Sequence, residues 1–404
     1  MKRRRPRWSE LREHIQLDLP AFGDEGRVAR TASIEDLRRI ARRRTPRAVF
    51  DYADGAAGQE ETALRRAREA FGRVELIPEV LQDVSEIDMS TTILGQPSAL
   101  PFAFAPTGFT RVMGTEGEVA VGNVAKRVGI PHALSTMGTT SIEQLAGEVG
   151  PANRWFQLYV WRDRGASQAL VERAKAAGYT ALLLTVDTHV AGDRMRDVRN
   201  GFTQPPALTL RTIGDMALHP AWWFDMLTTE PLRFANLVAE RGTIGDMVGR
   251  ILDPGLDFDD LDWLRSIWDG PLVVKGVMTP KGATQVVERG ADAVVVSNHG
   301  GRQLVQAPTP LEQLPGIVDA VGDRAEVMLD GGIMDGGDIV AAVAMGASAC
   351  LVARAYLYGL MAGGEAGVQR AADLLSAGVR RTMALMGART VADLTPDKVR
   401  LRSF

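Results

Sequence analysis

The sequence of 404 residues contains a single cysteine, Cys350, which excludes an internal disulfide and a cysteine-rich metal site. It also lacks a run of about 18 apolar residues, the length that a membrane-spanning helix needs. The basic residues between positions 2 and 7 are followed by polar residues, whereas a signal peptide would continue into an apolar core. These absences predict a cytoplasmic protein without a metal, either soluble or peripheral to the inner face of the membrane.

An excess of charge of one sign is absent too. The chain has 47 basic and 50 acidic residues and a net charge of −3, so it shows no overall electrostatic footprint for nucleic acid. Arginines are locally dense between residues 38 and 47, which we interpret as a solvated helix face, with an acidic partner or lipid headgroup as the alternative. Hydrophobic residues make up 45% of the chain, enough for one large domain with appendages.

Short apolar segments alternate with segments of helical periodicity from residue 101 onward. Eight of them are candidate strands: 101–107, 131–136, 155–160, 181–187, 271–277, 292–298, 326–331 and 349–354. Helical segments at 116–127, 167–177, 281–289 and 337–345 fall between them. Eight such units predict a parallel (β/α)₈ barrel of the α/β class. A doubly wound sheet is the alternative, but no Gly-x-Gly-x-x-Gly follows the first strand.

The barrel is expected to occupy residues 101–390, between an N-terminal extension and helical cover (1–100) and a C-terminal tail (391–404). In the extension, residues 1–33 are predicted to be irregular until Ser33 caps a helix over Ile34–Arg44. Residues 188–256 interrupt the alternation after the fourth strand, where a long insertion usually serves as a lid or binding loop. Its aromatic cluster at 222–227 is expected to pack on the barrel, with contact to a membrane or a hydrophobic electron acceptor as the alternative.

The segment 297–304, Ser-Asn-His-Gly-Gly-Arg-Gln-Leu, directly follows the apolar run 293–296. Histidine can accept a proton near neutral pH, and the planar fork of arginine matches a carboxylate. Two glycines between His299 and Arg302 let the backbone turn sharply close to a ligand. The segment therefore indicates proton transfer on a small carboxylate.

Polar residues recur at the ends of other predicted strands, where barrel enzymes place their chemistry. Residues two apart share a strand face, as do Gln157 with Tyr159, Thr185 with Asp187, and Ser297 with His299, while Lys275 ends a further apolar run. One such residue alone would most often be a satisfied core group, but four strands agree. Asp187 is expected to orient the His299 ring, and His189, just beyond it, could line the site.

The last two predicted strands end in Asp330-Gly331-Gly332 and in Arg354. Glycine-rich backbone after the seventh and eighth strands is where barrels commonly bind phosphate. The sequence therefore predicts a cofactor that carries a phosphate.

In these motifs the chain resembles the FMN-dependent α-hydroxy acid dehydrogenases and oxidases over roughly residues 33–390. The resemblance rests on residues 50–52, 105–108, 156–159, 185–187, 275–276 and 297–304. Residues 197–201, 222–224 and 356–359 are most similar to the actinobacterial quinone-linked L-lactate dehydrogenases within that family.

The resemblance implies a role for each matching residue. His299 would be the base, paired with Asp187, and Arg302, Tyr52, Tyr159 and Arg194 would hold the substrate. Contacts to FMN would come from Pro106, Thr107, Gly108, Ser135, Gln157, Thr185, Lys275, Ser297, Asp330, Gly331, Gly332, Ala353 and Arg354. Lys275 would stabilise negative charge on the reduced flavin.

The reaction implied is oxidation of an L-2-hydroxy acid, L-lactate to pyruvate above all, with electrons passed to a quinone-type acceptor by a homotetramer. The alternatives are an oxygen-dependent oxidase or lactate 2-monooxygenase, and a flavin-binding barrel that has lost activity. Gly108 favours a dehydrogenase, because some oxidases of the family have alanine there. Four residues depart from the family pattern and leave room for altered substrate choice or weaker flavin binding: Ala56, His189, Val305 and Ala353.

Overall fold

The computed structural model describes residues 4, 7–12, 23–200, 210–236 and 253–402. Parts of the predicted insertion, residues 201–209 and 237–252, therefore lie outside the described residues.

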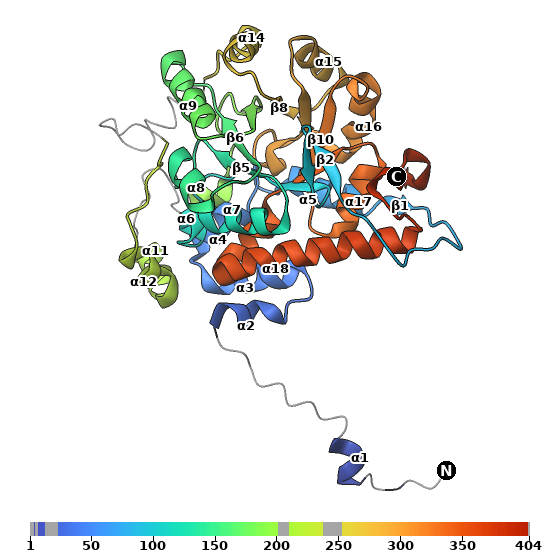
Figure 1. The fold of residues 1–404 in the computed structure, drawn as a ribbon. Helices are drawn as coiled ribbons and strands as arrows, with labels where there is room; N and C mark the ends of the chain where they lie inside the picture. Colours follow the sequence, from blue (N-terminus) through green and yellow to red (C-terminus); the bar gives the residue numbers. More distant parts are fainter. Residues whose placement is uncertain (1–3, 5–6, 13–22, 201–209, 237–252, 403–404) are drawn as a thin grey trace.

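Eight parallel strands close into a barrel in the order β10-β11-β4-β5-β6-β7-β8-β9, which confirms the predicted (β/α)₈ architecture (Figure 1). The strands are β4 (Phe102–Phe104), β5 (His132–Ser135), β6 (Arg154–Leu158), β7 (Ala181–Thr185), β8 (Leu272–Val277), β9 (Ala293–Val296), β10 (Glu326–Asp330) and β11 (Ala349–Val352). All but β8 end earlier than the sequence predicts. Tyr159, Asp187 and Ser297 therefore lie just beyond the strands, in the loops at the barrel mouth, whereas Gln157 and Thr185 stay within the hydrogen-bonded ladder.

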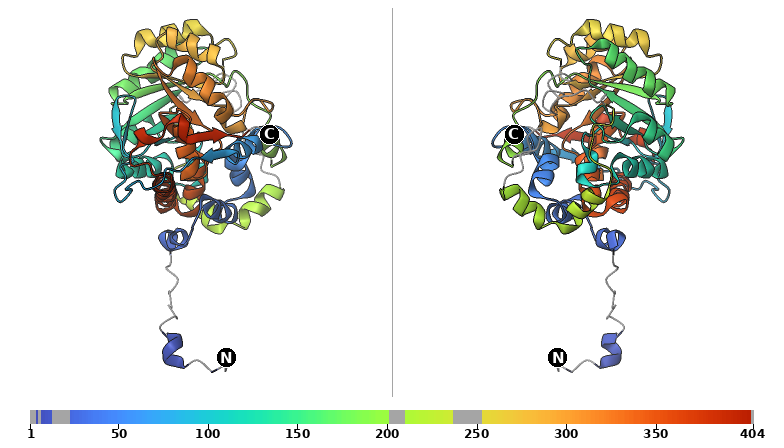
Figure 2. Two further views of the ribbon diagram at one scale, coloured as in Figure 1. Left: turned by 90° about the vertical axis from the view of Figure 1, so that its right-hand side faces the viewer. Right: turned by 90° about the vertical axis from the view of Figure 1, so that its left-hand side faces the viewer.

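Helices cover the outside of the barrel (Figures 1 and 2). They are α6 (Thr110–Met113), α7 (Gly117–Val128), α8 (Ile142–Val149), α9 (Arg164–Ala176), α14 (Phe258–Ile267), α15 (Pro280–Glu288), α16 (Pro310–Val321), α17 (Gly336–Ala344) and α18 (Arg354–Met386). The four predicted helices correspond to α7, α9, α15 and α17 within a few residues.

Alternation along the strands divides the core into two layers. On β7, Leu182 and Leu184 pack outward against the helices, whereas Leu183 belongs to a separate cluster inside the barrel. Ile93 and Leu94 join this inner cluster from the hairpin formed by β2 (Thr91–Ile93) and β3 (Gln96–Ser98). The barrel interior is thus packed, and the open end is the one at which the strands' carboxyl ends lie.

The N-terminal extension is more helical than the sequence predicts. Helix α3 (Ile34–Arg44) has the expected bounds, with the Ser33 side chain accepting a hydrogen bond from the Asp36 amide. Helices α1 (Trp8–Arg12) and α2 (Gly23–Ala29), however, lie in the region predicted to be irregular. Val28 of α2 is buried in the core, and α2 and α3 both pack against α18 (Figure 1). Helix α2 is stabilised by this long-range contact, which its own short sequence does not reveal.

The C-terminal residues are paired. Strand β12 (Val399–Leu401) aligns antiparallel with β1 (Val74–Leu76), and Arg400 forms an ion pair with Glu75 at 2.5 Å. The segment predicted to be a C-terminal tail, residues 391–404, therefore contains a strand and two short 3₁₀-helices.

The described part of the insertion contains α10 (Met195–Arg199), α11 (Leu210–Ala217) and α12 (Pro220–Thr228). The predicted packing of its aromatic cluster holds for Trp222, whose Nε1 donates to the Val112 carbonyl. Phe224 and Leu227 are instead 58% and 76% exposed. None of the helices in the described residues has the length and apolar character needed to cross a membrane.

Candidate active site

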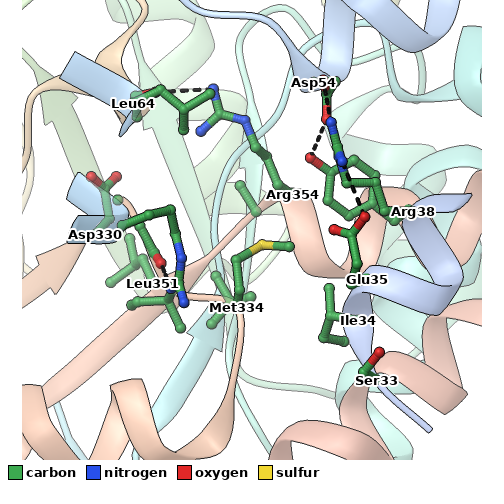
Figure 3. A pocket seen from close by; sticks show the side chains of 18 of the residues that line it. Ser33, Ile34, Glu35, Arg38, Asp54, Leu64, Asp330, Met334, Leu351 and Arg354 are labelled. Carbon is green, nitrogen blue, oxygen red and sulfur yellow. Dashed lines mark hydrogen bonds and ion pairs between the residues drawn. The ribbon is translucent and has the colours of Figure 1, made fainter. Parts of the chain in front are cut away.

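A cavity of about 330 Å³, here called the central chamber, opens at the carboxyl ends of the strands. It brings together the predicted residues Tyr52, Pro106, Thr107, Gly108, Ser135, Gln157, Tyr159, Thr185, Arg194, Lys275, His299 and Arg302. A second cavity of about 480 Å³, the side chamber, contains Gly331 and Gly332 (Figure 3). The two chambers adjoin, because Asp330, Ala353 and Arg354 line both.

His299 and Asp187 form the predicted pair, with 2.9 Å between His299 Nδ1 and Asp187 Oδ1. Because an ionised carboxylate only accepts hydrogen bonds, Nδ1 carries the proton and Nε2 is left to accept one. Burial by itself raises the pKa of Asp187, but the charge and hydrogen bond of His299 outweigh it and lower that pKa. Asp187 therefore remains a carboxylate that can stabilise an imidazolium.

The backbone that carries His299 is strained. His299 has φ 58°, a left-handed conformation that is uncommon for any residue except glycine, and Gly301 follows with φ 76°. A Cβ atom at Gly301 would lie 2.8 Å from the Leu64 amide nitrogen. The loop is held by the Asn298 side chain, which accepts from the Gly301 amide at 2.9 Å. The position of the imidazole is thus fixed by tertiary contacts.

Lys275 places an ammonium group deep in the central chamber. Its Nζ lies 2.6 Å from Asp330 Oδ2 and donates to Ser297 Oγ at 2.9 Å. Burial lowers the pKa of Lys275, but Asp330 and Asp187 more than compensate, so the pKa is raised and the side chain stays protonated. Ser297 does not itself line the chamber, and it contacts the site through the hydrogen bond that it accepts from Lys275.

Three neighbouring strands supply a connected row of polar side chains. Ser135 Oγ donates to Gln157 Oε1 at 2.9 Å, and Gln157 Nε2 donates to Thr185 Oγ1 at 3.0 Å. The barrel register places Ser135 directly opposite Gln157 on adjacent strands. This row is fixed in orientation before any ligand binds.

Two arginines, Arg194 and Arg302, line the central chamber and lie close enough to influence each other's charge. Arg302 Nη1 donates to the carbonyl groups of Tyr52 and Gly55 at 2.6 and 2.9 Å, and its guanidinium lies 5.1 Å from the centre of the Tyr52 ring. Arg194, from the insertion, has a buried Nε without a hydrogen-bond partner among the described residues. A buried donor of this kind is suited to an anionic ligand.

The side chamber can hold a phosphate-bearing chain such as that of FMN. Gly331 and Gly332 have φ of 93° and 81°, so their backbone can approach a ligand closely. Asp330 Oδ1 is buried without a partner in the described residues and could accept from a hydroxyl group. Arg354 supplies the cation, and its Nη2 donates to the carbonyls of Gly55 and Gly300, both at 2.9 Å. These residues fit the cofactor that the resemblance implies.

A buried carboxylate joins four elements beside the side chamber (Figure 3). Asp54, at the end of α4 (Arg47–Asp54), accepts from Arg38 Nε at 2.5 Å, Arg196 Nη1 at 2.8 Å and Tyr358 Oη at 2.8 Å. Burial alone raises the pKa of Asp54, but these donors lower it to about 2. Arg38, which we interpreted as part of a solvated face, is thus ion-paired with a buried group.

Two residues of the insertion differ from what the sequence indicates about the site. His189 is exposed and does not line the central chamber, because the chain turns outward after Asp187. Asp197 does line it, although we had not included it among the site residues. Its spacing of three from Arg194 would have placed both on one helix face, had a helix been predicted there.

Comparisons with known proteins agree with this geometry. Residues 41–401 match the family described as FMN-dependent dehydrogenase. A Mycobacterium tuberculosis protein named "Putative L-lactate dehydrogenase" is 52% identical over 99% of this chain and 96% of its own length. The L-lactate dehydrogenase of Caulobacter vibrioides is 43% identical over 90% of this chain and 96% of its own.

A solved structure is similar over nearly the same range. The crystal structure of the monotopic membrane protein (S)-mandelate dehydrogenase superposes with a TM-score of 0.89 at 36% identity, and covers 92% of this chain and 100% of its own. The likeness therefore extends over the barrel, its helices and both chambers.

Proposed function

Because this chain belongs to the FMN-dependent dehydrogenase family, we propose that it oxidises an L-2-hydroxy acid, L-lactate above all, to the corresponding 2-oxo acid. The observation that carries the proposal is the His299–Asp187 pair in a chamber that also contains Arg194 and Arg302. A base and a carboxylate clamp are the two protein groups that this oxidation requires.

Arg194, Arg302 and Tyr52 bind the substrate carboxylate in this proposal, and Tyr159 donates a hydrogen bond to its hydroxyl oxygen. The burial of Tyr159 raises the pKa of its phenol, so the group stays neutral and able to donate. His299 Nε2 accepts one of the two protons released as the O–H and α-C–H bonds of the substrate break, while Asp187 stabilises the imidazolium that forms.

FMN, when bound, would take up the two electrons and the other proton that leave the substrate. The side chamber holds its phosphate and ribityl chain through Asp330, Gly331, Gly332, Ala353 and Arg354. Its ring system would be held by residues at the carboxyl ends of the strands, namely Pro106, Thr107, Gly108, Ser135, Gln157 and Thr185. The Lys275 ammonium, supported by Ser297, offsets negative charge on the reduced ring.

The test is anaerobic reduction of the purified protein. The protein should carry FMN, and L-lactate should bleach the flavin absorbance while D-lactate should not. Recovery of a protein that neither contains nor takes up FMN, or a flavin that no 2-hydroxy acid reduces, would rule the function out.

The proposed electron acceptor is a quinone at the cytoplasmic membrane surface. Support comes from the exposed apolar side chains of α12 and from the likeness to a monotopic membrane protein. Oxygen is the second candidate, because an L-lactate oxidase of Nostoc is 43% identical over 91% of this chain. Turnover with a quinone analogue should greatly exceed hydrogen peroxide production, and comparable rates would favour the oxidase.

The proposed assembly is a homotetramer in the cytoplasm, with part of the population at the membrane. Light scattering on the FMN-loaded protein measures the assembly, and a monomer would contradict it.

A further inference from the structure

Helix α10 has two charged faces with different surroundings. Arg196 points away from the central chamber and binds Asp54, with Asp51 and Glu61 also within ion-pair distance. Arg194, at the N-cap of this helix, and Asp197, three residues later, both line the chamber. Residues three apart lie on one side of a helix, so α10 presents a cation and an anion to the chamber together.

The carboxylate of Asp197 is not held by a structural contact in the described part of the chain. Among the described residues it has no ion pair within 4 Å and its side chain accepts no hydrogen bond. The other two carboxylates near the base are paired, Asp187 with His299 and Asp330 with Lys275. Burial raises the pKa of Asp197, and the guanidinium groups of Arg302 and Arg194 oppose that rise. The ionisation of Asp197 is thus influenced by the charges of the two arginines that would bind a substrate carboxylate.

Of the charged groups that line the chamber, Lys275 is paired with Asp330 and Arg354 is assigned to the phosphate of FMN, so Arg194, Arg302 and Asp197 remain to face a substrate. Burial and the nearby Arg194 lower the pKa of Arg302 to about 9, which still leaves it protonated at neutral pH. Two cations and one anion leave a single positive charge, which one carboxylate neutralises. A substrate with a second carboxylate would bring an excess negative charge next to the partly buried Asp197.

We propose that Asp197 is a specificity-determining residue that makes the chamber discriminate against dicarboxylic 2-hydroxy acids. The proposal rests on the proposed function. Coulomb energy is proportional to the product of the charges, so a dianion is repelled by Asp197 about twice as strongly as a monoanion at the same place. Because the group is partly buried, salt screens this repulsion less than it would at the surface.

The test compares L-malate with L-lactate in Asp197→Asn, which removes the charge and keeps the shape. The ratio of kcat/KM for L-malate to that for L-lactate should rise on the order of tenfold or more. The matched control is Asp193→Asn, at an exposed residue of the same insertion outside the chamber, which should leave the ratio within about twofold of wild type. An unchanged ratio in Asp197→Asn would overturn the proposal.

Binding without turnover separates this proposal from the proposed function. Calorimetry on the FMN-loaded protein should show that Asp197→Asn tightens the binding of malonate, a dianion, more than that of pyruvate. Equal factors for the two ligands would contradict the role of Asp197. If wild type binds both ligands but no hydroxy acid reduces its flavin, the proposed function fails, while the binding comparison still decides the role of Asp197. Asp197→Ser serves as a second variant and should shift both ratios in the same direction.

Discussion

At the scale of single residues, the side chains proposed to act on substrate or cofactor are each oriented by a neighbouring polar group. The His299 ring is fixed by Asp187 and by a strained backbone, and Lys275 is fixed by Asp330 and Ser297. Orientation of this kind favours catalysis, because little rearrangement is needed when charge develops.

Replacement of His299 by glutamine should leave FMN bound and slow flavin reduction by L-lactate by about 10²–10⁴-fold, the usual contribution of a general base. Stopped-flow absorbance of the flavin measures the rate. His189→Gln is the matched control, since that exposed histidine lies outside the chamber and its loss should not matter. A near-normal rate in the His299 variant would assign proton removal to another group.

The clamp can be tested at Arg302. Arg302→Lys keeps the charge but loses the planar guanidinium, whose Nη1 donates to two carbonyl groups and whose other donors are available to a carboxylate. We expect KM for L-lactate to rise at least tenfold, with a smaller change in kcat. Steady-state kinetics with a soluble acceptor measure both parameters, and an unaltered KM would exclude Arg302 from carboxylate binding.

At the scale of elements, ion pairs join helices that are distant in sequence. Asp54 of α4 binds Arg38 of α3, Arg196 of α10 and Tyr358 of α18, so one carboxylate connects the helix that carries Tyr52 with the helix that carries Asp197. These contacts position the substrate side of the chamber relative to the side chamber.

Loss of the contacts of Asp54 should change how the free energy of unfolding depends on pH. The pKa of Asp54 is lowered from 3.8 to about 2, so its stabilisation is fully present above about pH 4 and is lost as the pH falls through about 2. Asp54→Asn should lower the free energy of unfolding by about 2 kcal/mol near pH 7. In urea titrations the difference from wild type should narrow below pH 4, and a difference that is independent of pH would contradict this account.

The anchor of α10 predicts an effect on substrate binding. Arg196→Met removes the ion pairs to Asp51, Asp54 and Glu61 and should raise KM for L-lactate several-fold with FMN affinity retained, because Arg194 and Asp197 lose their fixed position. Arg199→Met, on the same helix at an exposed position, is the control and should behave like wild type. Equal kinetics in the two variants would show that the anchor does not position the clamp.

At the scale of the whole molecule, the barrel is closed by packing at one end and carries its chemistry at the other. The insertion then adds a helix whose apolar side chains face outward. Trp223, Phe224 and Leu227 of α12 are 36%, 58% and 76% exposed, so the helix presents apolar side chains to solvent.

If α12 contacts lipid, Phe224→Ser with Leu227→Ser should reduce the fraction that sediments with anionic phospholipid vesicles, while turnover with a soluble acceptor stays normal. Leu385→Ser is the control, because Leu385 is 72% exposed but lies on α18. Sedimentation that is equal in both variants would remove α12 from the proposed membrane contact.

The sequence by itself determined the barrel and most of the site. Strands such as Ala293–Val296 are short apolar runs between turn residues, and a helix such as Ile34–Arg44 begins with its own capping side chain, so both are encoded locally. The ends of consecutive parallel strands must meet at one edge, which brought His299, Asp187 and Lys275 together without any knowledge of distances.

Only the tertiary structure decided the remaining features, because they depend on contacts between residues far apart in the chain. The pairing of β12 with β1 joins residues more than 300 positions apart, and no local pattern marks it. His189 points to solvent and Asp197 to the chamber because of how the insertion folds back on the barrel. The carboxylate of Asp54 becomes a junction only when three other helices pack around it.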